Sequence, residues 1–182
     1  MRKVRAAINM TLDGYCDHTS VTPDEEIHQH FADVLDGAGV ILYGRITYQL
    51  MLFWKSLIDH PSGEKSMDDF AIAIDRIPKI VFSRTMRDSG WGSATLATKP
   101  LEEFVMELKQ QPGGDILVGC RSLIIQLLKA KLIDELQICV HPVIAGGGLP
   151  LFEDITVRKE FCLIKSKIFS SGAVALYYQP TN

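Results

Sequence analysis

The sequence lacks several features that would define its chemistry outright. Its four cysteines, at positions 16, 120, 139 and 162, form no C-x-x-C pair, which argues against a zinc site or a disulfide framework. The formal net charge of −3 excludes the strongly basic footprint of a nucleic-acid-binding protein. No stretch approaches the ~20 apolar residues that cross a bilayer, and Asn9 and Asp13 interrupt the N-terminus too early for a secretory segment. We therefore expect a cytoplasmic protein with no metal, membrane or nucleic-acid partner.

Standard phosphate-binding motifs are also absent. The sequence has no G-x-x-x-x-G-K-[ST] run, and A-G-G-G-L-P (145–150) lacks the following helix that a dinucleotide-binding fingerprint requires. The histidines offer no ligand pair, because His28 and His30 stand two residues apart and would point in different directions on a helix. We interpret them as surface or hydrogen-bonded side chains.

The composition of the chain is that of an ordinary globular protein. Its 182 residues, 47% apolar and 23% charged, suit a single domain over residues 1–182. Hydrophobic periodicity predicts strands at 3–10, 39–44, 79–83, 93–97, 115–119, 135–144, 161–169 and 173–178. It predicts a first helix that begins within 22–25 and ends near residue 37. It predicts further helices over 47–52, 66–77, 100–111 and 121–131. Thr22 is the expected cap of the first helix, with Glu25 completing a capping box.

The order of these segments predicts the architecture. Strands that alternate with helices up to about residue 132 imply parallel pairing through crossover helices. Ser170-Ser171-Gly172 leaves room only for a hairpin between the last two strands. The sequence therefore predicts an α/β fold in three layers, with a mixed, mostly parallel sheet, an antiparallel C-terminal hairpin and helices on both faces.

Three of the expected strands end in residues suited to an anion. In open α/β sheets, ligands lie beyond the carboxyl ends of the strands, where helix N-termini present free N–H groups. Each end places an arginine beside small or hydroxylated residues: Gly44-Arg45-Ile46-Thr47, Ser83-Arg84-Thr85 and Gly119-Cys120-Arg121-Ser122. Backbone geometry alone would explain one such turn. Three together favour an extended ligand with several phosphates, held by guanidinium groups along one rim.

Several longer segments resemble one family. They are T-L-D-G (11–14), G-R-I-T-Y (44–48), K-I-V-F-S-R-T (79–85), G-G-D-I-L-V-G (113–119) and L-I-D-E-L-Q-I-C-V-H-P-V-I-A-G-G-G-L-P-L-F (132–152). In this order they resemble the dihydrofolate-reductase-like superfamily, and within it the reductase domain of riboflavin biosynthesis (RibD C-terminal-like) and its stand-alone bacterial relatives. The resemblance implies the three-layer dihydrofolate-reductase-like fold, an NADPH-dependent reductase and a homodimer.

The resemblance also implies roles for the strand ends. Arg45 and Arg84, with Ser83, would hold the adenosine 2′-phosphate of NADPH, and Thr47 would bind the pyrophosphate. The turn Gly119-Cys120-Arg121-Ser122 would bind the pyrophosphate as well, and the first strand, near Ala7 and Ile8, would flank the nicotinamide. Gly44 and Thr85 complete the set of cofactor-binding residues that we expect.

The expected substrate is a small flat heterocycle, such as a pterin, a pyrimidine or a related imine or carbonyl compound. Tyr15, Tyr48 and Trp54 are candidates for an aromatic wall around it, with ordinary core packing as the alternative, and for Phe53 we expect core packing. Asp13, in the T-L-D-G-Y loop, is the candidate proton donor. A turn aspartate ahead of Gly14 is an equal alternative for it.

Two departures from the family pattern bear on function. Ile27 stands where dihydrofolate reductases carry a carboxylate, if Phe31 matches the aromatic residue of the family's first helix. The D-x-P-x-L-x-x-R run of the riboflavin-pathway enzymes is also absent. These departures keep a second hypothesis open, a non-catalytic protein that binds or senses NADP(H). Cys120 is expected to be a packed turn residue rather than a reactive thiol.

Overall fold

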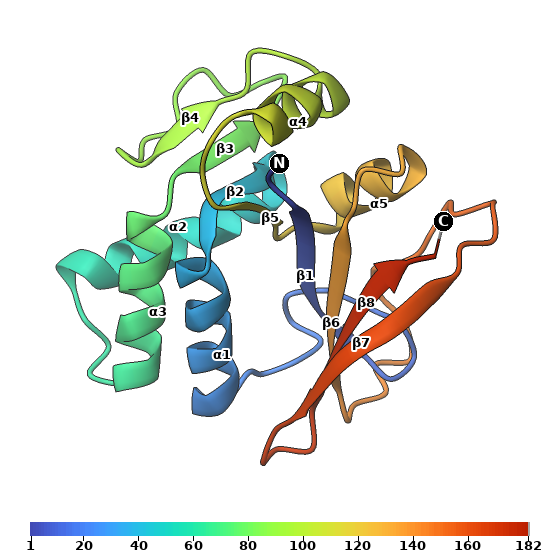
Figure 1. Cartoon of the computed structure of the whole chain (residues 1–182). Helices are drawn as coiled ribbons and strands as arrows, with labels where there is room; N and C mark the ends of the chain where they lie inside the picture. Colours follow the sequence, from blue (N-terminus) through green and yellow to red (C-terminus); the bar gives the residue numbers. More distant parts are fainter. Residues whose placement is uncertain (182) are drawn as a thin grey trace.

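The alternating segments fold into one mixed sheet between two layers of helices (Figure 1). The computed structural model describes residues 1–181. The strands are β1 (Val4–Thr11), β2 (Ala38–Gly44), β3 (Lys79–Phe82), β4 (Ala94–Leu96), β5 (Asp115–Val118), β6 (Glu135–His141), β7 (Phe161–Ile168) and β8 (Val174–Pro180). The helices are α1 (Glu25–Asp36), α2 (Arg45–Asp59), α3 (Lys65–Arg76), α4 (Leu101–Gln110) and α5 (Arg121–Lys129).

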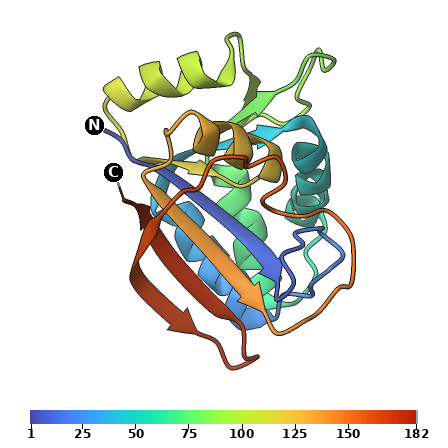
Figure 2. The same ribbon diagram turned by 90° about the vertical axis from the view of Figure 1, so that its right-hand side faces the viewer.

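The pairing of the strands confirms the predicted architecture. The sheet has the order β4-β3-β2-β5-β1-β6-β8-β7. The pairs from β4 to β6 are parallel, and β8 pairs antiparallel with both β6 and β7. Helices α1, α2 and α3 lie on one face of the sheet, and α4 and α5 lie on the other (Figure 2).

The centre of the sheet places three carboxyl ends side by side. β5 lies between β2 and β1, and Val118 near its end is paired with Leu42 on one side and with Ala6 on the other. The chain leaves β2 and β1 towards one face of the sheet and leaves β5 towards the opposite face. Such a switch in direction opens a crevice where ligands of α/β proteins bind.

Strands β1, β2 and β5 have almost continuous apolar sequences because both of their faces are buried. Val4, Leu42 and Ile116 are 0% exposed, because helices cover both faces of the parallel part of the sheet. The edge strand β7 differs, since Leu163, Ile164 and Ile168 are exposed. The core therefore lies around β2, β5 and β1, next to the crevice.

Two helix predictions were wrong in detail. α2 extends to Asp59 rather than ending at Leu52, since helix-compatible residues continue until Pro61 and no glycine or proline interrupts them. The cap of α1 is Asp24 rather than Thr22, and its side chain accepts a hydrogen bond of 2.9 Å from the Ile27 amide. The longer α2 includes Phe53 and Trp54, which are described below.

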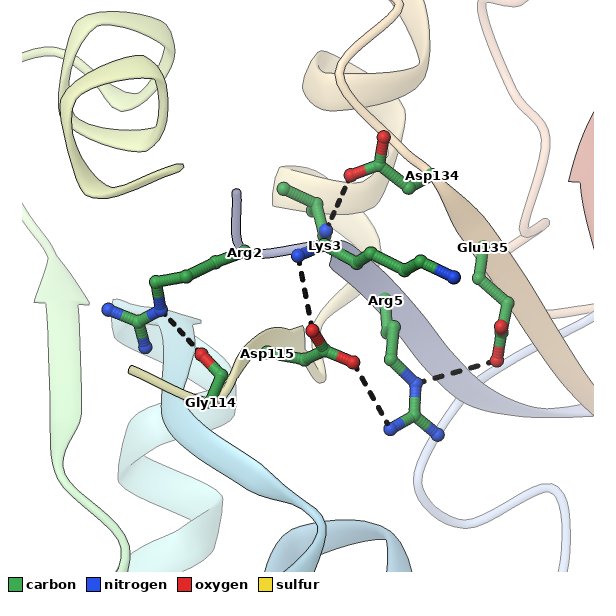
Figure 3. A network of polar contacts seen from close by, with 8 residues as sticks. Arg2, Lys3, Arg5, Gly114, Asp115, Asp134 and Glu135 are labelled. Atoms are coloured by element: carbon green, nitrogen blue, oxygen red, sulfur yellow. Dashed lines mark hydrogen bonds and ion pairs between the residues drawn. The ribbon is translucent and has the colours of Figure 1, made fainter. Parts of the chain in front are cut away.

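Charged residues at the opposite, amino-terminal edge of the strands are bonded to one another (Figure 3). Arg5 lies 3.8 Å from the Asp115 carboxylate and 3.4 Å from that of Glu135. Arg2 Nε donates to the carbonyl oxygen of Gly114 at 2.5 Å. These contacts join β1 to β5 and β6, so the arginines of this edge have a structural role.

Membrane-spanning helices and metal-binding clusters are both absent from the described residues. Across residues 1–181, no helix has both the length and the apolar character needed to cross a bilayer. The same part of the chain contains no group of three or more His, Cys, Asp or Glu side chains placed to hold a metal ion.

Candidate functional site

Two neighbouring cavities open at the carboxyl edge of the central strands. The first, of about 890 Å³, lies between the start of α2, the end of β3, residues 97–101 and the start of α5; we call it the polar cavity. The second, of about 670 Å³, lies between β1, α1, α2 and the turn after β5; we call it the apolar cavity. Ile46 and Thr47 line both cavities, so a ligand of sufficient length can occupy the two together.

The polar cavity gathers the residues of two predicted strand ends. It is lined by Arg45, Ser83, Arg84 and Thr85, together with Gly44, Thr47 and Ser122. Within residues 1–181, neither Arg45 nor Arg84 forms an ion pair, and Arg45 only donates to the Gln49 side chain at 3.3 Å. At the other edge of the sheet, Arg5 instead lies between the carboxylates of Asp115 and Glu135 (Figure 3). Guanidinium groups without carboxylate partners are suited to phosphate oxygens.

The loop after β3 is shaped by its own serine. Ser83 Oγ accepts hydrogen bonds from the amides of Thr85 at 3.2 Å and Met86 at 3.0 Å. These bonds use the lone pairs of the hydroxyl and leave its proton to donate outward. Since Ser83 lines the polar cavity beside Arg84, the loop presents a hydroxyl donor and a guanidinium together.

The turn after β5 packs tightly against the end of β2. The Gly44 amide donates to Cys120 Sγ at 3.2 Å, and a Cβ added to Gly44 would stand 3.1 Å from Ser122 Oγ. A Cβ on Gly119 would meet the Tyr43 ring at 3.0 Å. Burial raises the pKa of the Cys120 thiol. Cys120 is thus a packed turn residue, as expected, and it fixes the distance between the two strand ends.

Arg121 does not join the other two arginines. Arg121 lines the apolar cavity. Its Nε donates to the Pro150 carbonyl oxygen at 2.5 Å, and its Nη2 lies 2.5 Å from a carboxylate oxygen of Glu153. The expectation of three guanidinium groups along one rim is therefore wrong for this residue. No pattern in the sequence indicates that the 150–153 loop returns to the start of α5.

The apolar cavity lies beside the first strand, and Ala7 and Ile8, which the resemblance places next to the nicotinamide, both line it. Gly119 and Cys120 also line it. On the opposite side, α2 contributes Trp54, whose ring packs edge-on against Phe70 at 4.5 Å between centroids.

Helix α2 has an unusual distribution of apolar residues. Of its 15 residues, only Tyr48 is fully buried. Ile46 and Phe53 are 67% and 54% exposed, and both line the apolar cavity. Phe53 is therefore a cavity residue, and the expectation that it packs in the core was wrong.

Two of the predicted aromatic wall residues lie elsewhere. Tyr48 is 0% exposed, and its hydroxyl donates to the Ser89 carbonyl oxygen at 2.9 Å, because its side of α2 faces the core. Tyr15 forms a β-bridge with Pro150 and lines neither cavity. Trp54 alone of the three lines the apolar cavity.

Asp13 lies in an exposed turn and holds two loops together. Its carboxylate accepts hydrogen bonds from Thr11 Oγ1 at 2.6 Å and from the amides of Ala145 at 3.0 Å and Gly146 at 2.7 Å. The Thr11 hydroxyl and the two amides lower the pKa of Asp13 to about 2. The carboxylate is thus ionised at neutral pH and lines neither cavity, which favours the turn-aspartate alternative over a proton donor.

Sequence reasoning missed His28 as a cavity residue. His28 lines the apolar cavity, and its ring lies 5.5 Å from that of Trp54 and 6.3 Å from that of Phe70. Burial lowers its pKa below 6.5. Helical spacing alone could not identify it, because His28 and Ile27, three and four residues before Phe31, both share a face with that residue. Ile27, four residues before Phe31, is 1% exposed and packs with Phe169 and Tyr177 instead.

The fold and the cavities together define an α/β domain with a phosphate-suited cavity next to an apolar one at the switch point of its sheet. The chain belongs to the RibD C-terminal domain family, whose model matches residues 2–175. It is 33% identical over 181 residues to YyaP of Bacillus subtilis (strain 168), covering 97% of this chain and 94% of YyaP. The resemblance found in the sequence is thereby confirmed.

Solved structures share the fold over the whole chain. A protein from Shewanella sp. PV-4 named for riboflavin biosynthesis superposes with a TM-score of 0.74 at 22% identity, covering 100% of both chains. A pyrimidine reductase-like protein from Corynebacterium diphtheriae has a TM-score of 0.68 at 14% identity, covering 100% of this chain and 92% of that one. At these identities the likeness concerns the fold.

Proposed function

We propose that this protein is an NADPH-dependent reductase that transfers a hydride to a small flat heterocycle. One observation carries the proposal: Arg45 and Arg84, without carboxylate partners, line a polar cavity that shares Ile46 and Thr47 with an apolar cavity beside β1. Membership of the RibD C-terminal domain family and a likeness in fold to a pyrimidine reductase-like protein support it.

The residues present suit the phosphates of NADPH. Arg45, Ser83, Arg84 and Thr85 supply charged and hydroxyl donors for a 2′-phosphate, a group that NADH lacks. The start of α5, with Ser122 and the backbone of Gly119 to Arg121, supplies donors for the pyrophosphate at a helix N-terminus. Arg121 acts there through its backbone, since its side chain is bound to Pro150 and Glu153.

When bound, NADPH supplies the hydride; the reaction uses one NADPH and one proton for each C=N or C=O bond reduced and releases NADP⁺. The chain itself provides position and a dry environment. Ala7 and Ile8 form one wall of the apolar cavity, and Trp54 and Phe53 form another. These surfaces exclude water from the bond that is reduced.

A proton donor is also required, and His28 is our candidate in place of Asp13. Its ring lines the apolar cavity among aromatic side chains, whereas the Asp13 carboxylate is occupied by two backbone amides. Burial lowers the pKa of His28, so the imidazolium form, which is the acid, is favoured towards lower pH.

The cofactor proposal is tested by titrating the protein with NADPH and NADH. We expect micromolar NADPH binding by the wild type. Arg84→Ala should weaken NADPH binding by roughly 10- to 100-fold, because a charge-assisted hydrogen bond contributes about 1.5–3 kcal/mol, and should leave NADH binding unchanged.

Arg87→Ala is the matched control, since Arg87 is an exposed arginine three residues away that lines neither cavity. Absence of NADPH binding by the wild type, or an equal loss in both variants, would contradict the proposal. Cofactor binding without turnover of any heterocycle in a panel would instead support the sensing alternative.

A further inference from the structure

We propose that Asn9 determines specificity in the apolar cavity, where its amide N–H₂ group binds a carbonyl oxygen on the substrate ring and His141 holds the amide in this orientation. The inference rests on the proposed function and names the residue that recognises the ring. The juxtaposition that suggests it is a buried histidine bonded to a side chain of the cavity wall.

Asn9 lies near the end of β1, in the wall of the apolar cavity. It is half-buried and lines the cavity together with Ala7, which projects from the same face of the strand because the two residues are two apart. That face is turned towards α1, since Gln137, which is paired with Ala7, contacts His30 of that helix. The substrate site is therefore bounded by Asn9 on the sheet and by His28 on α1.

His141 fixes which end of the Asn9 amide a ligand meets. Its Nε2 lies 2.9 Å from Asn9 Oδ1, and its side chain is 4% exposed. An amide oxygen can only accept, so Nε2 carries the proton and donates it. The bond joins neighbouring positions on adjacent strands, because His141 is paired with Thr11, two residues after Asn9. It uses Oδ1 and leaves both protons of Nδ2 to be donated elsewhere.

The Asn9 amide nitrogen is open to a ligand. In the described part of the chain, the Asn9 side chain forms no hydrogen bond besides the one to His141. Across residues 1–181, Ser66 Oγ is the one buried side-chain nitrogen or oxygen that lacks a hydrogen-bond partner. Asn9 Nδ2 is therefore accessible, and the space that Asn9 borders is the apolar cavity. A ligand with no acceptor there would remove water from Nδ2 without replacing its hydrogen bond, which is unfavourable.

Two other polar side chains of the cavity are already engaged. The Arg121 guanidinium is bound to the Glu153 carboxylate, and the Asp17 carboxylate accepts a hydrogen bond from the Leu149 amide. Asn9 thus supplies an oriented donor that no protein group uses. A site with a fixed donor accepts a ring carbonyl and rejects an amino group, which is itself a donor.

The test uses two probes that differ at one ring position. 6-Methylpterin has a carbonyl group at C4, and 2,4-diamino-6-methylpteridine has an amino group there. Both are titrated into the protein alone and into the protein saturated with NADPH. We expect the wild type to bind 6-methylpterin at least tenfold more tightly. Asn9→Leu should remove this preference, and Asn9→Asp, which replaces the donor with an acceptor, should reverse it.

Two variants of His141 test its positioning role. In His141→Leu the Asn9 amide can turn, so the two probes should bind with similar affinity. His141→Gln keeps an N–H donor and should restore the preference, whereas a merely structural role would make the two variants alike. Gln137→Met is the matched control, because it removes a buried amide from the same strand and lines neither cavity, so the preference should remain.

Each outcome decides the proposal. Equal or tighter binding of the diamino probe by the wild type overturns it, and so does binding of neither probe. A preference that survives in Asn9→Leu, or that is also lost in Gln137→Met, overturns it as well. Equal behaviour of His141→Leu and His141→Gln overturns the role of His141. The NADPH titration is read separately: failure of NADPH to bind removes the proposed function, while the preference measured in the protein alone still decides the role of Asn9.

Discussion

His28 is the side chain whose proposed role is most directly testable in turnover. If it donates the proton, the rate constant kcat should fall as pH rises through its pKa, which burial holds below 6.5. His28→Gln should remove this pH dependence and lower kcat by roughly 10²- to 10⁴-fold. The measurement is the pH profile of NADPH oxidation with any heterocycle that the wild type reduces.

His18→Gln is the control for this experiment, since His18 lines the same cavity but is exposed. An unchanged profile in His28→Gln would exclude the role. A loss of kcat with the same loss in His18→Gln would indicate a general disturbance of the cavity.

His30, two residues further on, controls stability rather than chemistry. It is 4% exposed, its Nε2 lies 2.7 Å from Gln137 Nε2, and burial lowers its pKa to about 4. Because the unfolded chain takes up a proton near pH 6.5 and the folded protein only near pH 4, stability is lost as pH falls between these values. The free energy of unfolding should drop by up to about 3 kcal/mol across this window.

Urea unfolding at pH 7 and at pH 4.5 measures this loss. His30→Gln should be less sensitive to the change in pH, since glutamine keeps a polar contact with Gln137 and does not titrate. His60→Gln, at an exposed loop position, should behave like the wild type. A pH dependence that is the same in His30→Gln and wild type would show that other groups dominate.

At the scale of the elements, the loop that contains Asp13 is hydrogen-bonded to the loop that contains Ala145. The Asp13 carboxylate receives both the Ala145 and the Gly146 amide, and the loop that it holds contains three glycines in succession, Gly146 to Gly148. We expect Asp13→Ala to speed hydrogen exchange at the two amides, because it removes their acceptor. The unfolding midpoint in urea should change little, as the contact is exposed.

Asp154→Ala is the matched control, since it removes a surface carboxylate from the segment that follows this loop. Unchanged exchange at Ala145 and Gly146 in Asp13→Ala would show that the loop does not depend on the carboxylate. The pKa of about 2 implies that the bonds persist in mildly acidic solution and weaken only as pH falls towards that value.

The order and type of all strands and helices followed from the sequence, because hydrophobic periodicity and turn residues agreed for each segment. The ends of α2 were harder to predict, since no proline or glycine stood near Leu52 to mark them. Several residues of the polar cavity could also be predicted, because they follow the ends of β2 and β3 in the sequence and parallel strands bring their carboxyl ends to one edge.

The rest of the site depended on tertiary contacts that a sequence does not show. Arg121 follows a strand end as Arg45 and Arg84 do, yet a loop 32 residues further along supplies its partner Glu153. Which side of α1 faces the cavity was decided by packing of Ile27 against Phe169. No pattern within the helix distinguishes His28 from Ile27 on this point.

At the scale of the whole molecule, we expect a homodimer. The edge strand β7 exposes Leu163 at 53%, Ile164 at 46% and Ile168 at 76%, and β8 is its single strand partner in the sheet of the described residues. Exposed apolar edge strands are normally covered. Light scattering should give twice the mass of the chain, and Ile168→Lys should shift the protein towards the monomer. A monomeric wild type at micromolar concentration would contradict this expectation.

The residues common to the two cavities have a practical consequence. Because Ile46 and Thr47 line both cavities, a ligand in one cavity would lie next to a ligand in the other, across the span of these two residues. A bisubstrate inhibitor that tethers a phosphorylated arm to an uncharged ring system would engage both halves at once. With a linker matched to that span, its avidity should exceed that of either half by roughly 10²- to 10⁴-fold.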